Sequence, residues 1–109
     1  MNAVAEALGL SLPGCSAIPA PYRERGQMAY ATGRRIVDMA YDDVRPSSIL
    51  KREALLNAIA TLAAMGGWTN AQPHLVAMAR HAGVEITPDD WMKYGRDVPL
   101  LVNMQPAGK

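Results

Sequence analysis

Glycine and proline interrupt this chain at short intervals, and their spacing limits it to short structural elements joined by turns. The 109 residues include 9 glycines and 8 prolines. Glycine loosens the backbone and proline removes a backbone donor, so both residues mark the ends of helices and strands. At this length the chain amounts to one domain at most.

Between these interruptions, apolar residues recur every three or four positions, which is typical of amphipathic helices. The clearest stripe contains Leu55, Ala58, Ile59, Leu62 and Met65. We expect about four to five helices. They run from Met1 to Leu8, from Tyr22 to Tyr41, from a Ser48 cap to Gly66, from Asn70 to Gly83 with Pro73 in the first turn, and from a Thr87 cap through Pro88 to Gly95. The segments Leu10 to Pro21 and Asp42 to Ser48 are predicted to be loops.

One segment is predicted to be a β-strand at the C-terminal end. Residues Val98 to Val102 are rich in valine and leucine, a composition that favours extended structure. A single strand cannot form a sheet alone, and the first helix begins at Met1 with no residue before it to act as a cap. We therefore expect a mainly helical piece of something larger.

Composition excludes several classes of function. Lys and Arg number 11 against 10 for Asp and Glu, so no basic surface is predicted for nucleic acid or for a membrane. Cys15 is the only cysteine, which excludes a disulfide framework or a cysteine-rich metal site within the chain. No stretch approaches the ~20 apolar residues of a membrane helix, and no signal-peptide pattern is present. We expect a cytoplasmic protein.

The turn Gly66-Gly67-Trp68-Thr69-Asn70, between two predicted helices, is the most informative feature for chemistry. Backbone N–H groups and the dipole at a helix start favour a carboxylate or a phosphate, and glycine lets a ligand approach the backbone. Gly67, Thr69 and Asn70 are therefore the candidate substrate-binding residues. An ordinary interhelical turn with Thr69 or Asn70 as the cap fits the same pattern, and the pattern alone favours this simpler alternative.

No other residues form a complete catalytic set or a metal site. His74 and His81 have no carboxylate or thiol near them in the sequence, which is a weak metal pattern. Cys15 has no neighbouring base to activate its thiol. The carboxylate pairs at 42–43 and 89–90 suit a solvated loop and a helix start, respectively. We expect neither catalytic residues nor metal ligands in this chain.

Several short motifs follow one another along the whole chain. They are ALGLSLPG at 7–14, IPA at 18–20, GRRIV at 33–37, NAI at 57–59, GGWTNA at 66–71, HL at 74–75, VPLL at 98–101 and QPAG at 105–108. In this order they resemble an internal stretch of the dihydroxyacid dehydratase/phosphogluconate dehydratase family. The string PAPYRER at 19–25 and the segment 100–108 are most similar to the branch of the family that dehydrates sugar acids such as arabinonate or xylonate.

The resemblance implies a hydro-lyase that converts a 2,3-dihydroxy sugar acid to a 2-keto-3-deoxy acid. Members of the family hold an iron–sulfur cluster through three cysteines, bind Mg²⁺ nearby, and use a serine of the C-terminal domain as the base. None of these residues aligns within this chain. The resemblance therefore implies that residues 1–109 are an internal fragment of the cluster-bearing N-terminal α/β domain, inactive alone and binding no cofactor, from a parent enzyme expected to be a homo-oligomer.

Two positions depart from the family pattern. Trp68 stands where members usually have Ser, and an indole there could block a pocket or remove a hydrogen bond. Lys51 stands where Thr is common, so a helix cap is expected to be lost. The resemblance places the turn from Gly67 to Asn70 near the active site.

Other interpretations stay open. The chain could come from a dihydroxyacid dehydratase of branched-chain amino-acid biosynthesis, or from a decayed or truncated gene, with Trp68 as a symptom. It could also be a non-enzymatic helical module that binds a partner through exposed apolar faces. A helix-turn-helix DNA-binding protein is disfavoured by the neutral charge balance.

Overall fold

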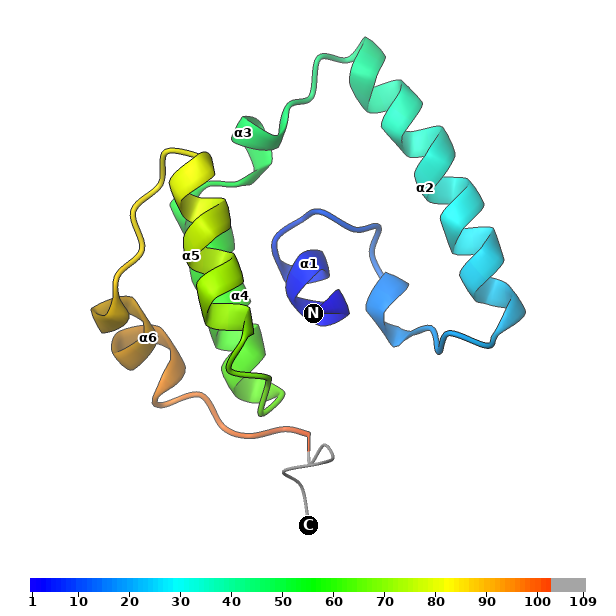
Figure 1. Ribbon diagram of the computed structural model, residues 1–109. Coiled ribbons are helices and arrows are strands. Elements are labelled where there is room, and N and C mark those ends of the chain that lie inside the picture. The colour runs from blue at the N-terminus through cyan, green and yellow to red at the C-terminus, as the bar shows by residue number, and fades with distance from the viewer. Residues whose placement is uncertain (103–109) are drawn as a thin grey trace.

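The computed structural model describes residues 1–102 as short helices joined by turns (Figure 1). The elements are α1 (Asn2–Ala7), the 3₁₀ helix η1 (Cys15–Ala17), α2 (Arg23–Tyr41), α3 (Pro46–Ile49), α4 (Arg52–Ala64), α5 (Ala71–His81) and α6 (Pro88–Gly95). Gly9, Gly66 and Gly83 follow α1, α4 and α5 with positive φ angles, the left-handed conformation that closes many helices. No helix in this part of the chain has both the length and the apolar character needed to cross a membrane.

The central element of the packing is α4, which α1, α5 and α6 contact (Figure 1). The buried side chains of the core are Val4, Leu8, Leu55, Ala58, Ile59, Leu75, Ala79 and Ile86. Burying one large aliphatic side chain contributes about 1.5–3 kcal/mol. This cluster therefore holds the first half of α4 against α1 and α5.

An ion pair ties the start of α6 to the start of α4. The Arg52 guanidinium donates a hydrogen bond to the Asp90 carboxylate at 2.5 Å and another to the Glu85 carbonyl oxygen at 2.6 Å. The same carboxylate accepts a hydrogen bond from the Thr87 N–H at 2.9 Å and forms a capping box with Thr87. The predicted start of this helix at Thr87 and Pro88 is thus confirmed.

These contacts predict how stability depends on pH. The hydrogen bond from the Thr87 N–H, together with Arg52, holds the pKa of Asp90 below its usual value although burial opposes this shift. A carboxyl group whose pKa is lower in the folded state stabilises the fold above its unfolded pKa, and this contribution is lost as the pH falls through the folded pKa. We expect the stability of the 109-residue chain to decrease below about pH 4.

Asp90→Asn is expected to lower the stability at pH 7 and to weaken this loss in acid. Urea unfolding of both proteins at pH 7 and pH 3 measures the two effects. An acid loss of the same size in Asp90→Asn and in the parent chain would contradict the assignment to Asp90.

The longest helix, α2, has no buried residue. Figure 1 shows it standing apart from the helices around α4. At its first turn, the Arg25 guanidinium donates to the carbonyl oxygen of Ile18 and lies 3.2 Å from the Cys15 Sγ atom. These contacts tie the first turn of α2 to the segment around η1.

The predicted strand at Val98 to Val102 is wrong, because the structure contains no strand within residues 1–102. Pro99 has no backbone N–H to donate, and no other extended segment lies beside these residues as a partner. Instead, the Leu101 N–H donates to the carbonyl oxygen of Ala64 at 2.7 Å, at the end of α4. A composition rich in valine and leucine is not sufficient for a strand without a neighbour.

The expected number of helices is also wrong, since the part of the chain that the structure describes has six α-helices. The extra one is α3, in a segment predicted to be a loop. Ser48 lies inside α3 and donates to the Arg45 carbonyl oxygen at 2.7 Å, so it does not cap the next helix. The N-cap of α4 is Lys51, whose side chain makes no capping hydrogen bond. This agrees with the expectation from the family resemblance that a cap is lost at Lys51.

Candidate functional site

The turn between α4 and α5 depends on two glycines in different ways. Gly66 has φ +57°, a conformation that side chains disfavour. The Gly67 N–H donates to the Leu62 carbonyl oxygen at 2.8 Å. A Cβ atom on Gly67 would lie 2.1 Å from the Leu62 Cδ1 atom and 3.0 Å from that carbonyl oxygen. The turn therefore has room for glycine alone at this position.

The residues after the glycines start α5 without a side-chain cap. The Ala71 N–H donates to the Trp68 carbonyl oxygen at 3.0 Å, and the Gln72 N–H donates to the Thr69 carbonyl oxygen at 3.1 Å. The side chain of the N-cap residue, Asn70, makes no capping hydrogen bond. Within residues 1–102, the backbone N–H groups of Trp68, Thr69 and Asn70 donate to no protein acceptor. Three successive N–H donors are thus without an acceptor among the described residues, which is the arrangement that anion binding would use.

A pocket of about 410 Å³, called here the turn pocket, lies between this turn and the end of α6. Its lining residues are Ile59, Leu62, Ala63, Gly66, Gly67, Trp68, Thr69, Gln72, Trp91, Met92, Gly95 and Arg96. The Trp68 side chain is 63% exposed at this pocket. Of the three candidate substrate-binding residues, Gly67 and Thr69 line this pocket and Asn70 does not; their role in binding stays a prediction.

Sequence reasoning missed Trp91 and Arg96, which come to the turn pocket from α6 and the residue after it. The pocket thus combines two indole rings with one guanidinium and the amide of Gln72. Such a mixture of aromatic surface and a few polar groups suits a small polar ligand. No motif marked these residues, because they meet the turn only through the packing of α6 on α4.

The other residues considered from the sequence do not come together. His74 and His81 are exposed on α5, and the Asp43 carboxylate pairs with Arg45 at 2.8 Å. Cys15 lies beside Arg25 near η1. Among residues 1–102, no group of three His, Cys, Asp or Glu side chains is placed to hold a metal ion.

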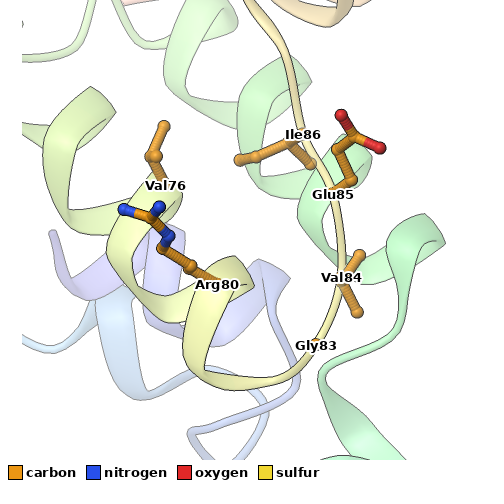
Figure 2. A pocket seen from close by; sticks show the side chains of 6 residues that line it. All are labelled: Val76, Arg80, Gly83, Val84, Glu85 and Ile86. Atoms are coloured by element: carbon orange, nitrogen blue, oxygen red, sulfur yellow. The ribbon is translucent and has the colours of Figure 1, made fainter.

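A second pocket, of about 370 Å³, lies where α5 ends. Figure 2 shows Val76 and Arg80 on one side and the segment from Gly83 to Ile86 on the other. The carboxylate of Glu85 points away from Arg80 (Figure 2). The polar groups of this second pocket do not converge, so the pocket lacks the features of a binding site.

Comparison with known proteins decides the family. The family described as dihydroxy-acid/6-phosphogluconate dehydratase, N-terminal, matches residues 1–109. The chain belongs to this dehydratase family. The resemblance drawn from the short motifs is therefore confirmed, although the QPAG motif at 105–108 lies outside the described residues.

Dehydratases of sugar acids are among the most similar relatives. A D-xylonate dehydratase of Caulobacter vibrioides is 76% identical over 100% of this chain and 18% of its own length. An L-arabinonate dehydratase of Rhizobium leguminosarum is 52% identical over 96% of this chain and 18% of its own length. A dihydroxy-acid dehydratase of Pyrococcus abyssi is 46% identical over 100% of this chain and 20% of its own length. The chain spans about a fifth of the length of these dehydratases.

Proposed function

We propose that these 109 residues are an internal part of the N-terminal α/β domain of a cytoplasmic sugar-acid dehydratase. The reaction is loss of water from a 2,3-dihydroxy acid to give a 2-keto-3-deoxy acid. The observation that carries the proposal is the match of the whole chain to the dehydratase family, together with 76% identity to a D-xylonate dehydratase. We propose an aldonate such as D-xylonate as the substrate and a homo-oligomer as the active form.

The turn pocket is the part of this chain that we assign to the substrate. The N–H groups of Trp68, Thr69 and Asn70 are suited to a carboxylate. The Thr69 hydroxyl and the Arg96 guanidinium add donors for a polyhydroxy acid. The role of these groups is binding and orientation, because no acid–base pair or nucleophile lies among them.

The residues of this chain do not fit the iron–sulfur cluster and the Mg²⁺ that the family resemblance implies. Cys15 is the only cysteine, and its Sγ atom lies against the Arg25 guanidinium rather than in a group of ligands. Within residues 1–102 no set of three ligands is available. We therefore assign both cofactors to residues outside this chain and derive no step of the reaction from them.

A chimeric enzyme tests the proposal. The 109 residues replace the aligned segment of the Caulobacter D-xylonate dehydratase, which is 76% identical, and the product is assayed with D-xylonate, L-arabinonate, 6-phosphogluconate and a branched-chain 2,3-dihydroxy acid. We expect formation of a 2-keto-3-deoxy acid from an aldonate. Preference for the branched-chain acid would instead favour a dihydroxy-acid dehydratase, and a chimera that folds without any activity would contradict the proposal.

A substitution of Trp68 tests whether the segment comes from a working enzyme or from a decayed gene. If the indole blocks the site, the chimera is inactive and Trp68→Ser restores activity, since Ser is usual at this position in the family. The exposed position of Trp68 at the edge of the turn pocket leads us to expect the opposite result. The chimera is expected to be active, and Trp68→Ser to raise the KM for D-xylonate through loss of apolar contact.

Thr69→Val tests the turn directly. This substitution keeps the shape of the side chain and removes the hydroxyl. We expect the KM for D-xylonate to rise about 2- to 10-fold with a smaller change in kcat, since a neutral hydrogen bond is worth about 0.5–1.5 kcal/mol.

Thr32→Val is the matched control for Thr69→Val. The Thr32 hydroxyl donates to the Met28 carbonyl oxygen at 2.8 Å within α2, far from the turn pocket in the sequence and on a different helix. Its removal is expected to leave KM unchanged. Equal KM values for the Thr69→Val chimera and the unsubstituted chimera would remove Thr69 from the site.

A further inference from the structure

The helix α2 carries an apolar surface on the side that faces away from the rest of the chain. Tyr30, Gly33, Val37 and Tyr41 follow one another at spacings of three or four, so they share one face of the helix. Tyr30 is 72% exposed, Val37 52% and Tyr41 88%. Isolated exposed apolar residues are common, but a continuous row of them marks a surface that another chain segment covers. We call this row the outer face of α2.

The outer face is shaped to receive side chains. One hollow is bordered by Ile36, Val37, Ala40 and Tyr41, and another by Tyr30, Gly33, Arg34, Val37 and Asp38. A Cβ atom built on Gly33 meets no described atom within 4 Å. Bulky side chains thus alternate with small ones along the helix, which is the relief that packing of ridges into grooves requires.

The opposite side of α2 is incompletely covered as well. A pocket of about 450 Å³ separates it from the segment after α1 and from α3. Apolar side chains dominate its lining, among them Leu10, Leu12, Met39 and Ile49. Leu10 is 41% exposed there. Among residues 1–102, the helix therefore lacks packing partners on two opposite sides.

A helix in this position is not stable by its own propensity. Without an apolar face buried against a neighbour, helices in water are marginal. Gly26 and Gly33 each lower the helix propensity of α2 by about 1 kcal/mol relative to alanine. The helix needs tertiary cover that the described residues do not supply.

We infer that the outer face of α2 packs against the part of the same dehydratase polypeptide that lies outside these 109 residues. This inference rests on the proposed function, since it requires the longer dehydratase chain. About four-fifths of the length of the relatives lies outside the match, which is ample to surround a helix. A second copy related by a two-fold axis would cover one side of α2 and leave the pocket on the other side open. Both sides of α2 are uncovered among the described residues, and only the surrounding chain can cover both.

Two variants of the chimeric enzyme test this surface. Val37→Glu places a charge on the outer face, and Ala31→Glu places the same side chain at an exposed position of α2 that is not three or four residues from any member of that face. We expect Val37→Glu to lower the Tm by at least about 5 °C, because a buried unpaired charge is strongly destabilising. Ala31→Glu is expected to leave the Tm unchanged.

Hydrogen exchange of the unsubstituted chimera keeps the test decisive if Val37→Glu does not fold. We expect the amides of residues 30–41 to exchange at least about 100-fold more slowly than in an unstructured peptide. Exchange at the unstructured rate would overturn the inference. So would a Val37→Glu protein that dissociates into monomers whose Tm is unchanged, because that result assigns the face to a second copy. A folded chimera with slow exchange at α2 and no dehydratase activity would reject the proposed function and leave the inference standing.

Discussion

Gly67→Ala is expected to lower the activity of the chimeric enzyme about 100-fold, the loss that a displacement of about 1 Å in a substrate-positioning group produces. The added methyl group would lie 2.1 Å from the Leu62 Cδ1 atom and 3.0 Å from the Leu62 carbonyl oxygen. The side chain can rotate away, but the carbonyl belongs to α4 and accepts the hydrogen bond of the turn. The turn must therefore move, and its N–H donors move with it. Steady-state kinetics with D-xylonate measures the loss.

Gly95→Ala is the control for the steric argument. A Cβ atom at Gly95 would lie 3.6 Å from the Ile59 Cγ2 atom and 3.7 Å from the Ala63 Cβ atom, both ordinary contacts with the same helix α4. Hydrogen exchange in the chimera is expected to show faster opening of residues 62–75 in Gly67→Ala, and no such change in Gly95→Ala. Equal exchange in the two variants would show that the space beside Gly67 is not the limiting feature.

Leu75→Ala is expected to reduce the free energy of unfolding of the 109-residue chain by about 2–5 kcal/mol. The Leu75 side chain is fully buried between α5 and α4, so its truncation leaves a cavity in addition to the lost transfer energy. Most small domains have only about 5–15 kcal/mol of stability in total. The variant is therefore expected to be close to unfolded at room temperature.

The neighbouring residue on α5 provides the control for Leu75. Val76 is 43% exposed, and Val76→Ala is expected to change the free energy of unfolding by no more than about 0.5 kcal/mol. Urea unfolding followed by far-ultraviolet circular dichroism compares the three proteins. Similar losses for both variants would mean that α5 does not pack on α4 as described.

The sequence was sufficient to predict the helices whose ends are marked by local chemistry. Thr87 and Pro88 start α6 through contacts within four residues, and Gly66 ends α4 through its own φ angle. Such signals depend on neighbours in the sequence and are visible there. The apolar stripe of α4 likewise indicated correctly which side chains face the core, with Leu55, Ala58 and Ile59 buried.

Features that depend on a distant partner could not be predicted in this way. The segment 98–102 has the composition of a strand, but its conformation is decided by the absence of a neighbouring strand within the described residues. Trp91 and Arg96 reach the turn pocket because Arg52 and Asp90 hold α6 against α4, 38 residues apart. The periodicity of α2 predicted a helix correctly, but it did not show that the apolar side would be uncovered.

The central position of α4 also determines when the other helices can pack during synthesis of the chain. The apolar side chains that bury Val4 and Leu8 begin at Leu50, so the core partners of α1 are made more than 40 residues after it. Six residues are too few to hold a helix without such a partner. The first half of the chain therefore leaves the ribosome tunnel with its apolar side chains exposed. Helix α1 gains its core packing late, when α4 emerges, and α5 and α6 then pack on α4.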